Sequence, residues 1–146
     1  IWVKETFLKF KKKFKINKNI YIDRTESKFS HCQIINHLEL QKYVIKKKFK
    51  IVKLYGQSFV KQIYIFWNAD CITGAHGAAF TNLVFCKPKT KVIELKPFRH
   101  PGKNYQRISK INNLHYHSIE SQKKYLKNKN GDIFVDLKKL DRKINL

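Results

Sequence analysis

Short apolar segments alternate with amphipathic segments along most of this chain, and no other feature constrains the fold as much. Five apolar segments have the length and composition of strands, at residues 19–24, 51–54, 70–73, 91–95 and 114–119. Amphipathic segments of about ten residues lie between them. Strands that alternate with helices in this way pair in parallel and are covered on both faces. We therefore predict an α/β fold, with a Rossmann-like, mostly parallel sheet and helices on both of its faces.

Capping residues and turn residues locate several element boundaries. Asn36 precedes a helical pattern, and Glu39 lies three residues further on, which is the spacing of a capping box. Ser58 is expected to cap the next helix. The His-Pro-Gly sequence at residues 100–102, which follows the fourth strand, is interpreted as a turn beside the site discussed below.

The 146 residues are enough for one compact domain with its own core. We place that domain at residues 19–146. Residues 1–18 are basic and carry Phe7, Phe10 and Phe14 at roughly helical spacing. They are expected to form either a helix packed on the domain or a helical connector.

The formal net charge is +22, from 32 Lys and Arg residues against 10 Asp and Glu residues. A charge of this size attracts polyanions and anionic membrane surfaces. Only four of the basic residues are Arg, the side chain that suits bidentate recognition of phosphates and bases, and the Lys residues are spread along the chain. This pattern favours affinity for a nucleotide or a membrane surface over specific nucleic-acid binding. A basic nucleic-acid-binding module is the alternative.

Neither a disulfide framework nor a metal site is indicated. Cys32, Cys71 and Cys86 form no CxxC pair, which favours a reducing compartment. His115 and His117 share one face of a strand, but no third ligand follows at a suitable spacing. No apolar run approaches the roughly 18–20 residues that a membrane-spanning helix needs.

Small residues fill the corner between the third strand and the helix expected after it, in the sequence TGAHGAAFTN of residues 73–82. Its small or hydrogen-bonding members include Gly74, His76, Gly77, Ala78, Ala79 and Thr81. Ligands of open parallel sheets bind beyond the carboxyl ends of the strands, where a starting helix offers unpaired N–H groups to phosphate. Small side chains leave those N–H groups accessible, and the imidazole and hydroxyl add further donors. The alternative is a corner built only for close packing.

The longer run GAHGAAFTNLVFCKPKTKVIELKP, at residues 74–97, resembles the signature of glycosyltransferase family 61. That signature has a segment similar to HGAGLTN, followed by a Phe, a Pro and then VIE. The matching positions are His76, Gly77, Ala78, Thr81, Asn82, Phe85, Pro88, Val92, Ile93 and Glu94. Upstream, residues 21–24 resemble the family's strand that ends in Arg, and Asn36, Glu39 and Leu40 resemble its N-x-x-E-L helix start. The resemblance spans residues 19–140.

The chain also departs from the family pattern. Members commonly have Gly where Ala79 and Lys89 stand, and Glu where His37 and Lys61 stand. The His-Gly-Ala core of the signature is intact.

The resemblance implies a two-domain GT-B enzyme, of which this chain is the C-terminal, donor-binding half. The expected reaction is transfer of a sugar from a nucleotide-sugar, expected to be UDP-linked, to a hydroxyl group of a glycan or other acceptor. The leaving diphosphate would be stabilised without a required metal, by the backbone at Gly77, Ala78 and Ala79 with help from His76 and Arg24. A truncated remnant without activity of its own is a further alternative.

Other roles carried over with the resemblance are less direct. Glu94 is expected to end a strand and either accept hydrogen bonds from ribose hydroxyls or pair with a nearby Lys. Asn82 is expected to hold the loop through backbone hydrogen bonds, and Thr81 to add a hydroxyl near the phosphates. The resemblance identifies no general base. Bacterial relatives imply surface polysaccharide synthesis by a cytoplasmic, membrane-peripheral enzyme, whereas eukaryotic relatives imply the lumen of the secretory pathway.

Overall fold

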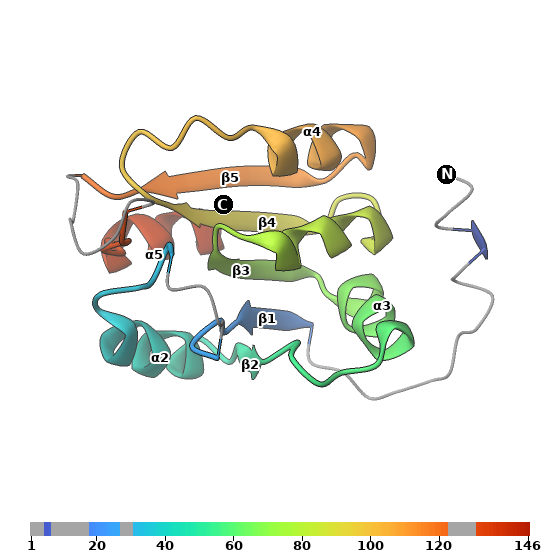
Figure 1. The fold of residues 1–146 in the computed structure, drawn as a ribbon, viewed down its shortest axis with the longest axis horizontal. Coiled ribbons are helices and arrows are strands. Elements are labelled where there is room, and N and C mark those ends of the chain that lie inside the picture. The colour runs from blue at the N-terminus through green and yellow to red at the C-terminus, as the bar shows by residue number, and fades with distance from the viewer. Residues whose placement is uncertain (1–4, 7–17, 27–30, 123–130) are drawn as a thin grey trace.

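The computed structural model describes residues 5–6, 18–26, 31–122 and 131–146. The helical segment expected at residues 1–18 therefore lies almost entirely outside the described residues. A five-stranded sheet forms the centre of the molecule (Figure 1). Its strands are β1 (Asn19–Ile22), β2 (Lys50–Val52), β3 (Cys71–Ala75), β4 (Lys91–Lys96) and β5 (His115–Glu120). All neighbouring strands are parallel, in the order β2-β1-β3-β4-β5.

Helices cover both faces of this sheet, so the α/β, Rossmann-like prediction is confirmed. They are α2 (His37–Lys46), α3 (Phe59–Asn68), the 3-10 helix η1 (Ala78–Phe85), α4 (Asn104–Ile111) and α5 (Leu137–Asn145). Leu40 of α2 and Leu140 of α5 pack in one core with Tyr21 of the sheet. The helices α3, η1 and α4 pack in a second core on the opposite face.

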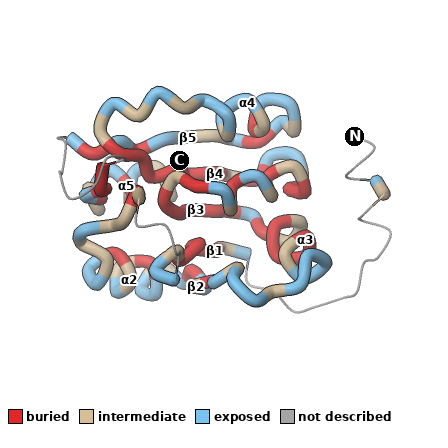
Figure 2. Tube along the Cα trace, in the orientation of Figure 1, coloured by how far each residue is buried: buried red, intermediate tan, exposed pale blue. Residues whose placement is uncertain are grey.

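The strands feed the two cores alternately, as a pleated strand buried on both faces must. In β1, Ile20 and Ile22 belong to the core under α3, whereas Tyr21 belongs to the core under α2. Figure 2 shows that burial is concentrated in the central strands, while the outer surfaces of the helices are exposed. Within the described residues, no helix has the length and apolar character needed to cross a bilayer.

The helix expected after β3 is present, and it is a 3-10 helix. Phe80, Leu83 and Cys86 are all fully buried and recur every three residues. A 3-10 helix has three residues per turn, so this spacing keeps all three side chains on the core face. The period of the buried residues therefore explains the tighter helix.

Two capping predictions had different outcomes. Ser58 caps α3, because its side chain accepts a hydrogen bond from the N–H of Lys61 at 3.3 Å. Asn36 makes no side-chain cap on α2, so that prediction was wrong. Its amide instead bonds the backbone of Val135, accepting from N–H at 3.0 Å and donating to C=O at 2.9 Å. Asn36 therefore makes two hydrogen bonds to the backbone ahead of α5 instead of one cap bond to α2.

The chain changes direction at β1 and β3. From β1 it moves outward to β2, then α3 carries it back across β1 to β3, and the later strands continue the other way. The connections that leave the carboxyl ends of β1 and β3 therefore diverge onto opposite faces of the sheet. Such a switch point opens a crevice at the strand ends, where open α/β sheets bind their ligands.

Candidate functional site

Arg24 and Gly77 meet at the switch point. Arg24 follows β1, and its Nη1 donates a hydrogen bond to the carbonyl oxygen of His76, which follows β3. The guanidinium lies directly over Gly77, so that a Cβ on this residue would come within 2.2 Å of Nη1. The backbone of Gly77 is extended and accessible to any residue, so its lack of a side chain serves this close approach.

Unpaired backbone donors lie beside this guanidinium. The N–H of Phe80 donates to the carbonyl of Gly77 and begins the turn of η1. In the part of the chain that the structure describes, the N–H groups of Gly77, Ala78 and Ala79 have no backbone acceptor. Ala78 is exposed to solvent and Ala79 half-buried. The start of η1 and Arg24 together form a corner of positive potential at the strand ends.

A cavity of about 260 Å³ borders Arg24 on the side of α2. Asp23, Thr25, Gln33 and His37 supply its polar wall. The buried carboxylate of Asp23 accepts a hydrogen bond from the N–H of Thr25 at 2.9 Å. Nε2 of His37 is buried 3.9 Å from Asp23 and has no hydrogen-bond partner among the described residues. The cavity therefore offers both a carboxylate and an unsatisfied imidazole nitrogen.

Glu94 is not the strand-end carboxylate that the sequence suggested. It lies within β4 and is 1% exposed. One of its oxygens bonds Nδ1 of His76, and the other accepts a hydrogen bond from the phenol of Tyr116 on β5. The expectations of ribose binding and of a solvated pair with Lys both assumed an exposed group. The register of the sheet instead buries this carboxylate beneath η1 and α4.

His76 is enclosed by further ionisable side chains. Its ring lies 3.9 Å from that of His100 and 5.1 Å from that of Tyr105, measured between centroids. Nδ1 of His100 accepts a hydrogen bond from the N–H of Gly102 at 3.1 Å. Burial, followed by the charges of His76 and Lys96, lowers the pKa of His100. Glu94, His100 and Tyr105 thus fix the orientation of the His76 ring from three directions.

Asn82 holds η1 in place, whereas Thr81 faces Tyr105 of α4. Burial raises the pKa of Tyr105 on α4, and the Thr81 side chain acts on this pKa in the opposite direction. Asn82 was expected to bond the backbone of its own loop, but its amide donates to Oε1 of Gln62 on α3 at 3.0 Å. The Gln62 amide in turn donates to the carbonyl of Gln57 at 3.1 Å. Asn82 therefore ties η1 to α3.

The comparisons with known proteins identify the family. The model of the glycosyltransferase 61 family matches residues 2–93, more than half of the chain. The chain belongs to glycosyltransferase family 61. A search of curated proteins finds no match. The matched region contains Arg24 and the start of η1 but stops one residue before Glu94.

Sequence reasoning about this glycosyltransferase missed Asp23, Tyr105 and Tyr116. Tyr116 pairs with Val92 in the sheet, and it faces Glu94 only because β4 and β5 are parallel neighbours. Tyr105 reaches His76 only because α4 packs on η1. Asp23 stood next to Arg24 in the family-like strand, and its position beside a basic residue was the available signal.

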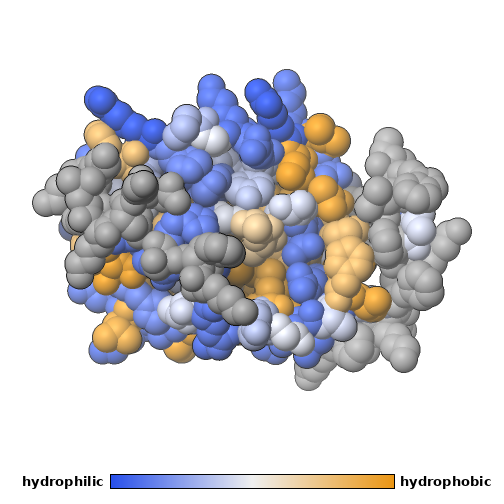
Figure 3. All heavy atoms as spheres, viewed as in Figure 1, coloured by the Kyte–Doolittle hydropathy of each residue, from blue (hydrophilic) through white to orange (hydrophobic). Residues whose placement is uncertain are grey.

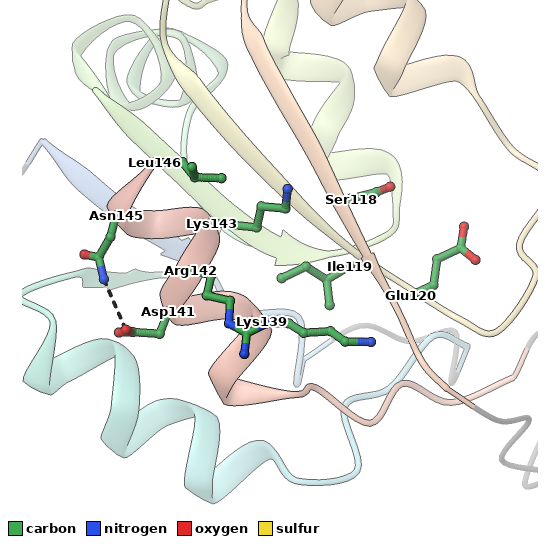
Figure 4. Close-up of a pocket in the computed structure, with 9 residues that line it drawn as sticks. All are labelled: Ser118, Ile119, Glu120, Lys139, Asp141, Arg142, Lys143, Asn145 and Leu146. Carbon is green, nitrogen blue, oxygen red and sulfur yellow. Dashed lines mark hydrogen bonds between the residues drawn. The ribbon is translucent and has the colours of Figure 1, made fainter.

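A hollow larger than the cavity beside Arg24 lies away from this site. It has a volume of about 880 Å³ and runs between β5 and α5 (Figure 4). Lys139, Arg142 and Lys143 line it from α5, and Glu120 from β5. It is open and basic, and it shares none of the residues of the switch-point corner. Size alone therefore does not identify a functional site.

Proposed function

We propose that the chain binds the diphosphate of a nucleotide-sugar, UDP-linked, at the switch point and transfers the sugar to a hydroxyl acceptor. The observation that carries this proposal is the meeting of the Arg24 guanidinium with the N–H groups of Gly77, Ala78 and Ala79, which have no backbone acceptor among the described residues. Helix starts and Arg side chains are the donors that proteins use for phosphate oxygens.

During sugar transfer, this corner would stabilise the leaving diphosphate. When the bond from the anomeric carbon to the diphosphate breaks, the leaving oxygen gains negative charge. Fixed N–H dipoles and a guanidinium stabilise that charge more in the transition state than in the bound donor. Arg24 keeps donors beyond the one that it gives to His76, because a guanidinium carries five N–H groups. The positive charge therefore comes from the protein, and we propose that transfer does not require a metal.

The rest of the donor would lie around this corner. We propose that the 260 Å³ cavity beside Arg24 takes the ribose or the transferred sugar, whose hydroxyls suit the Asp23 carboxylate and the His37 nitrogen. Residues 19–146 would be the donor-binding half of a GT-B enzyme, with residues 1–18 as connector or packed helix. The acceptor half would lie outside this chain, and the product would be a surface polysaccharide.

Calorimetry with UDP tests donor binding directly. Arg24→Ala should weaken UDP binding by about 10–100-fold, which corresponds to the loss of a charge-assisted hydrogen bond. Arg107→Ala removes the same charge from the exposed surface of α4 and should leave the affinity within about twofold. Equal losses in both variants would mean that general charge, not the corner, attracts UDP.

The nucleic-acid alternative makes a different prediction for the same samples. Binding to duplex DNA would fall steeply with salt, because neutralised phosphates release counterions. A folded chain that binds DNA in this way but shows no heat with UDP would overturn the proposed function.

A further inference from the structure

The two ring nitrogens of His76 have different surroundings. Nδ1 bonds the carboxylate of Glu94, which as an anion can only accept, so Nδ1 carries the proton of the neutral ring. Nε2 has no hydrogen-bond partner among the described residues. This nitrogen is also accessible to solvent. In the described part of the chain, two side-chain polar atoms are buried without a hydrogen-bond partner, His37 Nε2 and Ser109 Oγ, and His76 Nε2 is not one of them. The structure thus leaves a lone pair on Nε2 that solvent can reach.

His100 has the opposite arrangement. The N–H of Gly102 donates to its Nδ1, so that nitrogen must be unprotonated and the neutral ring carries its proton on Nε2. The two imidazoles lie against each other, at 3.9 Å between centroids. Gly102 can approach the His100 ring closely enough to donate this hydrogen bond because it has no side chain, since a Cβ would come within 2.8 Å of the ring. One imidazole of the pair therefore offers an acceptor, and its neighbour a donor.

Charged and titratable groups face His76 from every element around it. Arg24 approaches from the segment after β1, Glu94 from β4, and Tyr105 from α4. His100 contacts it from the segment after β4, where Lys96 also bonds the carbonyl of Gly102 at 3.1 Å. Tyr116 reaches the far side of Glu94 from β5. In this group, the unprotonated, accessible nitrogen is the Nε2 of His76.

We propose that His76 is the general base of sugar transfer, with Glu94 and Tyr116 as positioning residues that hold it in the base-competent tautomer. This inference rests on the proposed function. Nε2 takes the proton of the acceptor hydroxyl while that oxygen bonds to the anomeric carbon. The bond from the anomeric carbon to the diphosphate breaks, and its electron pair leaves with UDP. The imidazolium that forms is stabilised by the Glu94 carboxylate on its other nitrogen.

The sequence places this base next to the proposed diphosphate corner. His76 immediately precedes Gly77, and Arg24 contacts both residues. A proton acceptor and the donors for the leaving group therefore come from consecutive residues of one strand end. No second chain is needed to bring them together.

Glu94→Gln tests the tautomer without removing the imidazole. The Tyr116 hydroxyl donates and will hold the amide oxygen, so the amide NH₂ will face Nδ1 and force the His76 proton onto Nε2. We expect release of UDP from a panel of UDP-hexoses, UDP-N-acetylhexosamines and UDP-pentoses to fall by about 100-fold or more, the range for loss of a general base. Water and methyl glycosides serve as acceptors. UDP affinity should change by less than about threefold, because the diphosphate donors are untouched.

Tyr116→Phe supplies a rescue that a merely structural role would not give. Alone it should lower turnover modestly. Combined with Glu94→Gln, it frees the amide to rotate its oxygen toward Nδ1, so part of the lost turnover should return. A double variant slower than Glu94→Gln would overturn the assignment.

Nitrogen-15 NMR of the histidine side chains gives a readout that needs no substrate. It should show the proton of neutral His76 on Nδ1 in the wild type and on Nε2 in Glu94→Gln. A wild-type proton on Nε2, or a proton that stays on Nδ1 in Glu94→Gln, overturns the proposal. Failure to bind UDP at all contradicts the proposed function separately.

Discussion

At the scale of single residues, the contact between Arg24 and Gly77 makes a prediction that only a coupled experiment can check. Gly77→Ala adds a methyl group 2.2 Å from Nη1, so the guanidinium must move and UDP binding should weaken by about tenfold. In an Arg24→Ala background, the same substitution should change UDP affinity little, because the guanidinium that the methyl group would displace is absent. A double-mutant cycle of UDP affinities measures the difference. Additive losses would show that the two residues do not act through this contact.

Two histidines link stability to pH. Burial and neighbouring cations lower the pKa of His100 and of His117, with burial the larger cause in both. Below their ordinary value of 6.5, the unfolded chain then binds protons more readily than the folded one, so the free energy of unfolding should rise with pH through this range. Urea unfolding between about pH 5 and 7 measures the slope.

His117→Asn should make that slope shallower, because one of the two groups no longer titrates. His31→Asn, outside the sheet, controls for the loss of a histidine elsewhere. A slope unchanged by His117→Asn would exclude this residue as a source of the pH dependence.

The residue scale is also where sequence reasoning reached its limit. His76, Gly77 and Arg24 carried motif information, and the structure brings them together. The prediction that Glu94 is an exposed strand-end group was wrong, because its partner Tyr116 comes from a neighbouring strand, 22 residues away in the sequence. Which face of β4 this carboxylate occupies depends on strand register and on the helices above it. The local sequence around Glu94 determines neither the strand register nor the packing of these helices.

At the scale of elements, the bond from Asn36 to Val135 gives a test of what this residue does. Asn36→Ala should lower the free energy of unfolding by about 1–3 kcal/mol, since it leaves both backbone groups of Val135 without their partner. Asn36→Asp discriminates between roles. Aspartate caps helices as well as asparagine does. It cannot donate to the Val135 carbonyl, so it should also destabilise the fold, by a smaller amount.

Chemical denaturation followed by far-UV circular dichroism measures both variants. Full stability of Asn36→Asp would restore the capping interpretation.

Elements were easier to predict from the sequence than their details. The five strands and the helices between them were found because apolar periodicity is local. The 3-10 form of η1 was missed, although the period of three at Phe80, Leu83 and Cys86 was present, because burial had to be known before the period could be recognised. Lys89, where family 61 commonly has Gly, has a φ of 68°, which explains the family preference.

At the scale of the whole molecule, the charge of +22 and an amphipathic surface on α2 predict peripheral membrane binding. Leu38 and Ile45 are 72% and 60% exposed, and the exposed Lys42 and Lys46 lie beside them on the same helix. Figure 3 shows apolar side chains among hydrophilic ones over this region. Exposed apolar residues next to Lys suit the interface of an anionic bilayer.

Sedimentation with vesicles tests this surface. Binding to vesicles with phosphatidylserine should exceed binding to neutral ones and fall with salt, and Leu38→Asp should weaken it by about tenfold. Ile111→Asp is the matched control, because Ile111 is 82% exposed on α4, which covers the opposite face of the sheet. Equal effects of the two substitutions would mean that charge alone drives the association.

The bond between Asn36 and Val135 also has a consequence for how the protein is made. It joins positions 99 residues apart, and the Tyr43 hydroxyl on α2 likewise reaches Asp141 on α5 at a separation of 98. Neither contact can form on the ribosome until almost the whole domain has been synthesised, so α2 lacks its contacts with the C-terminal segment during translation. Chains rich in such distant contacts fold slowly and depend on chaperones while they wait. For this glycosyltransferase, the speed of translation and the supply of chaperones should therefore govern its yield in cells.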